Sequence, residues 1–173
     1  MIVKKEDIDA LIKNDPATAT PTEAVLCSPG LHALWAHRIE HALWKRGWRL
    51  AARAMATITR MITGVEIHPG AKIGRRVVID HGMGTVIGET AEIGDDCVIY
   101  QGVALGGTAN TRGMKRHPTL GKGVMVGCGA KVLGPILIPD GTRIGANAVV
   151  TKAPAEEGLT LVGIPARALE KKQ

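Results

Sequence analysis

Two histidines stand at the two places where a regular pattern in the sequence is interrupted. The first follows an aspartate, in Asp80-His81, and the second lies within Arg116-His117-Pro118. Histidine is the side chain whose ordinary pKa allows it to accept a proton near neutral pH. A carboxylate close to such a histidine can fix its tautomer and stabilise the imidazolium that forms. These residue types therefore predict general-base chemistry on a substrate hydroxyl.

The chain also offers groups that would assist such a base. Glu66 and Asp80 supply carboxylates near His81, and Gly106-Gly107 can expose backbone N–H groups toward a developing oxyanion. Base, carboxylate and oxyanion donors together suit acyl transfer from a thioester to an alcohol. A histidine in the break of a repeat is also a common surface or capping residue, so the residues alone leave both interpretations open.

The interrupted pattern has a period of six residues. A large aliphatic residue recurs at Ile67, Ile73, Ile79, Ile87, Ile93, Ile99, Leu105, Leu120, Val126, Val132, Ile138, Ile144 and Val150. The step from Ile79 to Ile87 is two residues too long, and the step from Leu105 to Leu120 is nine too long. Sixfold spacing with a small residue at each fifth position predicts a solenoid with three flat sides. These hexads would make about four coils, stacked at roughly 4.8 Å.

Residues 1–65 lack this repeat and are predicted to be helical. Their apolar residues follow the i, i+3, i+4 spacing of helices with one buried face. We expect helices over about 6–14, from Pro29-Gly30 to just before Gly47, and from Arg49 to about Ile62. The sequence thus predicts an α+β fold in three parts. These are a helical region over 1–65, a solenoid catalytic domain with one extended loop over 66–165, and a short C-terminal tail over 166–173.

The solenoid predicts a column of residues that ends at His81. Three hexads make one coil, so positions 18 residues apart, such as Cys128 and Ala146, should stack along one edge. If both insertions loop out, the same edge continues back through Gln101 to His81. A groove lined by small side chains admits a long, thin ligand, and a histidine at its end could act on the ligand's terminus.

Composition excludes several classes of protein. The net charge of +6 comes without basic clusters beside stacking aromatics, which argues against nucleic-acid binding. No apolar run reaches the roughly 18 residues of a membrane span, and the N-terminus lacks the apolar region of a signal peptide. The three cysteines Cys27, Cys97 and Cys128 form no evident disulfide framework, and Cys97 falls on a core position. We therefore expect a soluble, cytoplasmic protein without a membrane partner.

The hexads resemble the left-handed parallel β-helix of the hexapeptide acyltransferases. Within that group the chain is similar to the serine O-acetyltransferases, through IHPGAKIGRRVVIDHGMGTVIGETAEIGDDCVIYQGVALGGT, RHPTLGKGVMVGCGAKVLG and GIPARAL. The similarity runs from about Asp15 to Ala168. It implies transfer of an acetyl group from acetyl-CoA to the hydroxyl of L-serine, in cysteine biosynthesis and without a metal.

The resemblance also implies roles for individual residues. His81 is similar to the catalytic base and Glu66 to its carboxylate partner, which is often aspartate in the family. The longer side chain keeps the charge but alters the hydrogen bond to the ring. The implied serine-binding residues are Asp15, in NDPAT, with Asp80, Arg116 and His117. A guanidinium such as that of Arg116 suits a carboxylate.

Acetyl-CoA contacts and assembly are implied in the same way. The residues similar to acetyl-CoA contacts are Gly107, Thr108, Met125, Cys128 and Ala146. Arg75-Arg76 is either surface charge or an attraction for CoA phosphates. In the family the active site lies between subunits of a trimer, so His81 and the Arg116 loop should come from different chains. The helical region is shorter than in forms that pair two trimers, which leaves trimer and hexamer open. The expected short tail argues against a complex with cysteine synthase.

Three other functions stay open at this point. One keeps the fold but changes the acceptor to the hydroxyl of a sugar or a xenobiotic. Another is a zinc carbonic anhydrase-like trimer, for which His68, His81 and His117 would supply imidazoles. The third is a non-catalytic solenoid used for assembly, which leaves the two interruptions unexplained.

Overall fold

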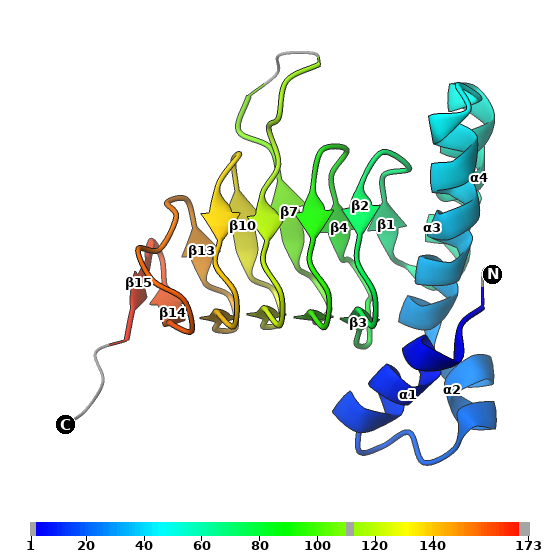
Figure 1. Cartoon of the computed structure of the whole chain (residues 1–173), viewed down its shortest axis with the longest axis horizontal. Helices are drawn as coiled ribbons and strands as arrows, with labels where there is room; N and C mark the ends of the chain where they lie inside the picture. Colours follow the sequence, from blue (N-terminus) through cyan, green and yellow to red (C-terminus); the bar gives the residue numbers. More distant parts are fainter. Residues whose placement is uncertain (1–2, 110–112, 170–173) are drawn as a thin grey trace.

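The computed structural model describes residues 3–109 and 113–169, in which four helices precede a coil of short strands (Figure 1). The helices are α1 Lys5–Asn14, α2 Pro21–Cys27, α3 Pro29–Lys45 and α4 Arg49–Thr63. The predictions of α1, α3 and α4 are confirmed. Helix α4 ends where expected, because Gly64 adopts a left-handed φ of 73° and donates its N–H to the Arg60 carbonyl.

Helix α2 was not predicted, although its N-terminus carries a recognisable signal. Pro21 occupies the first turn, and the Thr20 hydroxyl accepts a hydrogen bond from the Glu23 N–H at 3.2 Å. The Glu23 carboxylate reaches back to the Ala19 N–H at 2.9 Å. This arrangement resembles a capping box, which a search for Thr-Pro-x-Glu would have found.

Each turn of the solenoid contributes one short strand to each of three sheets. The strands are β1 Glu66–Ile67, β2 Lys72–Ile73, β3 Val78–Ile79, β4 Val86–Ile87, β5 Glu92–Ile93, β6 Val98–Ile99, β7 Ala104–Gly106, β8 Thr119–Leu120, β9 Met125–Val126, β10 Lys131–Leu133, β11 Leu137–Ile138, β12 Arg143–Ile144, β13 Val149–Val150, β14 Thr160–Gly163 and β15 Ala166–Ala168. The orders are β1-β4-β7-β10-β13, β2-β5-β8-β11 and β3-β6-β9-β12-β14-β15. From β1 to β13 the neighbours are thus three strands apart, as the hexads predict, whereas β14 pairs with β12 and β15 with β14.

All described strand pairs are parallel except the last, in which β15 pairs antiparallel with β14. Residues 166–168, which the sequence assigned to the tail, thus extend a sheet; residues 170–173 lie outside the described part. The repeated aliphatics fill the interior, and Cys97 is fully buried among them. This position confirms the predicted packing role, and burial raises the pKa of the Cys97 thiol to about 11.

The helices meet the coil at its N-terminal end (Figure 1). Helices α1 and α3 both contact β3, and an apolar cluster that includes Leu11, Leu31 and Val78 lies between them. A Cβ at Gly30 would overlap with the carbonyl oxygen of Ile79. Because no side chain fits there, glycine allows the start of α3 to lie directly against the strand that precedes His81.

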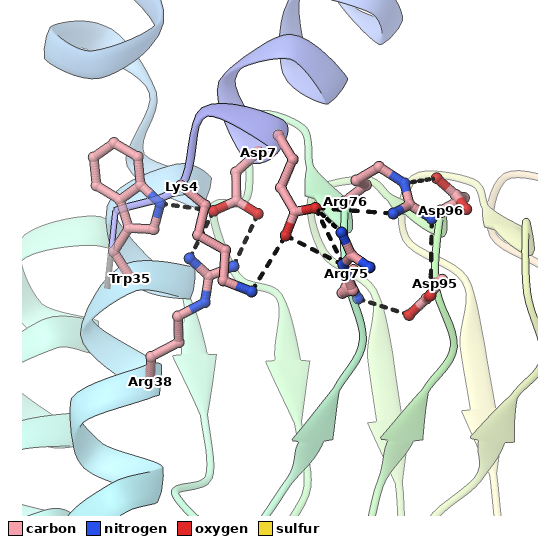
Figure 2. A network of polar contacts seen from close by, with 9 residues as sticks. Lys4, Asp7, Trp35, Arg38, Arg75, Arg76, Asp95 and Asp96 are labelled. Carbon is pink, nitrogen blue, oxygen red and sulfur yellow. Dashed lines mark hydrogen bonds and ion pairs between the residues drawn. The ribbon is translucent and has the colours of Figure 1, made fainter. Parts of the chain in front are cut away.

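A polar network fixes α1 to α3 and to one corner of the coil (Figure 2). Asp7 is 2% exposed and accepts hydrogen bonds from Arg38, at 2.6 and 2.8 Å, and from Trp35 Nε1, at 3.1 Å. Glu6 pairs with Arg75, whose guanidinium lowers the pKa of that carboxyl to about 2. The same arginine donates its backbone N–H to Asp95 at 2.8 Å, while Arg76 pairs with Asp96 at 2.6 Å. These two arginines therefore bind carboxylates of their own chain.

Candidate active site

The strand register places His81 at the end of the predicted column. Ile79 pairs with Ile99, Ile99 with Val126, and Val126 with Ile144. Residues two positions after each of these, namely His81, Gln101, Cys128 and Ala146, therefore stack along one corner. The assumption that both insertions leave the register intact is confirmed. The longer insertion leaves the coil after β7 and returns at β8 (Figure 1).

His81 has an unusual backbone conformation at this corner. Its φ is 57°, in the left-handed region that non-glycine residues rarely adopt. The two-residue insertion makes this turn possible, since Gly82 and Gly84 also have positive φ and the Gly82 N–H binds the Asp80 carbonyl at 2.6 Å. Such strain is concentrated at functional sites in proteins. The imidazole is exposed at the surface of the corner.

One cavity of about 330 Å³ brings together three of the predicted residues. Asp80 and His81 come from the corner after β3, and Asp15 comes from the end of α1. The Asp15 carboxylate accepts hydrogen bonds from Thr18 Oγ1 at 2.5 Å and from the Ala17 N–H at 2.8 Å. These bonds lower its pKa, the Thr18 hydroxyl having the largest effect. The cavity thus pairs an ionised carboxylate with an imidazole and suits a ligand that carries an ammonium group.

Within a single chain, Glu66 does not line the cavity that contains His81. Its carboxylate forms an ion pair with Arg60 at 2.8 Å. Together with Arg53 and His68 it lines a separate cavity of about 80 Å³. Burial lowers the pKa of His68 to about 4, so this imidazole is neutral at physiological pH. Within one chain the Glu66 carboxylate thus contacts Arg60, and its contact with His81 stays a prediction.

Arg116 and His117 belong to another region, centred on Glu89 and Thr90. Arg116 forms an ion pair with Glu89 at 2.6 Å. His117 is 8% exposed, and its Nδ1 lies 2.9 Å from Thr90 Oγ1. The adjacent cavity, of about 370 Å³, is lined by charged residues and one aromatic: Trp44, Arg49, Lys72, Glu89, Glu92, Lys115 and Arg116. Its excess of cations suits a carboxylate or a phosphate.

Sequence reasoning missed Glu89 and Thr90 as members of the site. The stacking argument used for His81 could have found them, because Ile87 pairs with Leu105 and so places Glu89 beside Gly107. The long loop starts at this position. The sequence therefore allowed the prediction that Glu89, a charged residue beside the start of the loop, binds the residues at the end of the loop.

The residues predicted to contact acetyl-CoA form two groups. Cys128 and Ala146 lie in the same corner column as His81, and Met125 lies in the adjoining strand β9; all three are half-buried or exposed. Gly107 and Thr108 begin the long loop, and a Cβ at Gly107 would lie 3.3 Å from His117 Nε2. The first group borders the base and the second borders the Arg116 region.

A metal centre has no support among residues 3–109 and 113–169, in which no three His, Cys, Asp or Glu side chains are grouped to hold an ion. The histidines considered for zinc are separated, since His68 lies beside Arg53, His81 beside Asp15 and His117 beside Thr90. In that same part of the chain, none of the helices combines the length and the hydropathy of a membrane span.

Comparison with known proteins agrees with the geometry. The chain is 56% identical over 167 residues to the serine acetyltransferase of Mycobacterium tuberculosis, covering 96% of this chain and 72% of that one. It is 55% identical over 164 residues to the serine acetyltransferase of Helicobacter pylori, covering 95% of each. No protein-family model matches the chain.

A solved structure gives the same result. Serine acetyltransferase from Brucella abortus in complex with coenzyme A superposes with a TM-score of 0.92 at 37% identity, covering 98% of this chain. This chain spans 67% of the length of that one. The predicted left-handed β-helix is the fold of these proteins. The chain shares more than half of its aligned residues with the two relatives named above, of which it covers 72% and 95%, and it has the same fold; it therefore belongs to the serine acetyltransferase family.

Proposed function

We propose that the chain transfers the acetyl group of acetyl-CoA to the hydroxyl of L-serine, giving O-acetyl-L-serine and CoA for cysteine biosynthesis in the cytoplasm. The observation that carries this proposal is the cavity shared by Asp15, Asp80 and His81. It offers a base for a hydroxyl and a carboxylate for an ammonium group, and the ammonium group distinguishes serine from simple alcohols. The names of the relatives support the same acceptor.

The reaction is a direct attack. The His81 imidazole takes the proton of the serine hydroxyl while the oxygen bonds to the thioester carbonyl carbon. The negative charge then rests on the carbonyl oxygen of a tetrahedral intermediate, where backbone N–H groups can stabilise it. Collapse of the intermediate breaks the C–S bond, and the departing CoA thiolate recovers the proton from the imidazolium. No covalent enzyme intermediate and no metal take part.

Charge complementarity supports an active site shared between chains of a homotrimer. The lining of the His81 cavity contains acids and the base but neither lysine nor arginine. The Arg116 cavity contains cations but lacks both His81 and Asp15. A serine zwitterion needs both, because its ammonium group fits Asp15 and its carboxylate fits Arg116.

The thioester would approach along the small residues of the column. Cys128 and Ala146 leave room for a narrow pantetheine arm that ends near His81, and Met125 would form a wall of this groove. Gly107 and Thr108, at the start of the long loop, would supply further contacts to acetyl-CoA. Neither a sugar or xenobiotic acceptor nor zinc chemistry is favoured by a specific contact.

An acceptor screen tests this proposal. Release of CoA thiol from acetyl-CoA is followed with L-serine, D-serine, L-homoserine, simple sugars and chloramphenicol-type alcohols. L-serine should give the highest kcat/KM. A sugar or xenobiotic alcohol that reacts faster than L-serine would replace the proposed acceptor.

A further inference from the structure

Thr90 uses all its polar groups on the segment that carries Arg116 and His117. Its hydroxyl oxygen accepts the Arg116 N–H at 3.0 Å and the His117 N–H at 3.1 Å. The same hydroxyl lies 2.9 Å from His117 Nδ1, and the Thr90 N–H lies 3.2 Å from that nitrogen. The Thr90 carbonyl accepts a hydrogen bond from Lys115 Nζ at 2.7 Å. One threonine therefore binds three consecutive residues of the loop.

These contacts fix which nitrogen of His117 carries the proton. A backbone N–H can only donate, so the nitrogen that it meets must present a lone pair. Both acceptor positions of the Thr90 hydroxyl are occupied by backbone N–H groups, which leaves its own proton for Nδ1. In a neutral imidazole the remaining proton is then on Nε2.

The residues packed around His117 determine where its Nε2–H lies. A Cβ at Gly88 would overlap with the His117 ring, so glycine is needed for the imidazole to lie against the coil. Nε2 faces Gly107, at the start of the long loop. Glu89 holds the guanidinium of the preceding residue, Arg116, at 2.6 Å, and the Arg116 side chain also borders Gly107. Burial, followed by the charge of Arg116, lowers the pKa of His117, which keeps the ring neutral.

We infer that Thr90 is a positioning residue, which holds His117 as the Nε2–H tautomer and fixes Arg116 beside it for recognition of the acceptor's carboxylate. This inference rests on the proposed function for the identity of the acceptor, whereas the tautomer is a property of the protein alone. Thr90 touches no reacting atom, and it acts through His117 and the backbone of the loop.

The test compares Thr90→Val with Thr90→Ser. Valine keeps the shape but removes the hydroxyl, whereas serine retains the hydroxyl. Thr142→Val is the matched control, because Thr142 is fully buried in the same solenoid and its hydroxyl has no partner among the described residues. Histidine-selective ¹⁵N NMR, with the His117 signal assigned by its loss in His117→Gln, reports tautomer and pKa without any substrate. Steady-state kinetics with L-serine and acetyl-CoA report recognition.

The wild-type protein, Thr90→Ser and Thr142→Val should show the Nε2–H tautomer of His117. Thr90→Val should keep this tautomer, because the backbone N–H at position 90 still meets Nδ1, but it should show a raised His117 pKa, since the hydroxyl donor to the neutral ring is lost. Its KM for L-serine should rise roughly tenfold, as expected for loss of a buried hydrogen-bond partner. Its KM for acetyl-CoA should stay within about twofold of wild type, because the contact serves the acceptor.

An Nδ1–H tautomer of His117 in the wild-type protein or an unchanged His117 pKa in Thr90→Val would overturn the inference, as would a Thr90→Ser protein as impaired as Thr90→Val. If the wild-type protein failed to acetylate L-serine, the proposed function would fall, and the NMR comparison would still decide whether Thr90 sets the state of His117.

Discussion

Two variants that are inactive separately should restore activity when they assemble together. His81→Ala removes the base from one cavity, and Arg116→Ala removes the cation from the other. Because these cavities are separate within one chain, a shared site would take His81 from one chain and Arg116 from its neighbour. In a mixed trimer, a site between an Arg116→Ala chain and a His81→Ala chain can be intact.

The expected recovery follows from this arrangement. With equal amounts of both chains and random assembly, half of the His81 positions and half of the Arg116 positions are native. About one quarter of all sites then combine both native residues. Each mixed trimer, however, contains one such site in three, so a preparation freed of homotrimers should have about one third of wild-type activity in a cyclic assembly. A site built within a single chain would contain both native residues in none of the mixed trimers.

The assay uses co-expressed chains that carry different affinity tags, purified over both tags so that every assembly contains both variants. CoA-thiol release is measured at a serine concentration at which Arg116→Ala alone has little activity. Each variant carrying both tags serves as the background control. Activity of the mixed protein no higher than the sum of these backgrounds would refute a site shared between chains.

Two further predictions concern the elements that position the site. Gly30→Ala should lower the free energy of unfolding by about 2 kcal/mol, measured by chemical denaturation. The added methyl group would overlap with the Ile79 carbonyl and force α3 away from β3. Unchanged stability would show that this close approach of α3 to β3 is dispensable. Burial lowers the pKa of His37 from 6.5 to about 3 in the folded protein. As the pH falls, the unfolded chain is therefore protonated at this histidine before the folded chain is. The folded state keeps its full stability above pH 6.5 and loses part of it as the pH falls toward 3. Between pH 7.5 and 5.5 this single group should cost about 1.4 kcal/mol per chain. In His37→Gln the free energy of unfolding should change with pH by that much less over this range. An equally steep pH dependence in the variant would contradict the assignment of this effect to His37.

The sequence predicted the parts of the site that depend on periodicity. The sixfold spacing gave the stacking of His81, Gln101, Cys128 and Ala146, because residues in neighbouring coils lie at a fixed separation along the chain. It also gave the buried position of Cys97. The helices that carry long amphipathic patterns were found as well, whereas α2, with seven residues, was too short to show a period.

The missed contacts depend on how separate elements pack. Glu89 and Thr90 bind residues 26 and 27 positions later, across a loop whose return path no periodicity describes. Asp7 meets Arg38 only because α1 folds back onto α3, a contact 31 residues apart in the chain. The cavity at Asp15 likewise requires α1 to lie against β3, which follows from tertiary packing and from the glycine at position 30.

The most direct test of the account is the turnover of His81→Ala with acetyl-CoA and L-serine. Loss of a general base should lower kcat by about 100-fold or more, while circular dichroism and the oligomeric state stay as in the wild-type protein. A folded His81→Ala protein that acetylates L-serine at nearly the wild-type rate would contradict the claim that this histidine is the base.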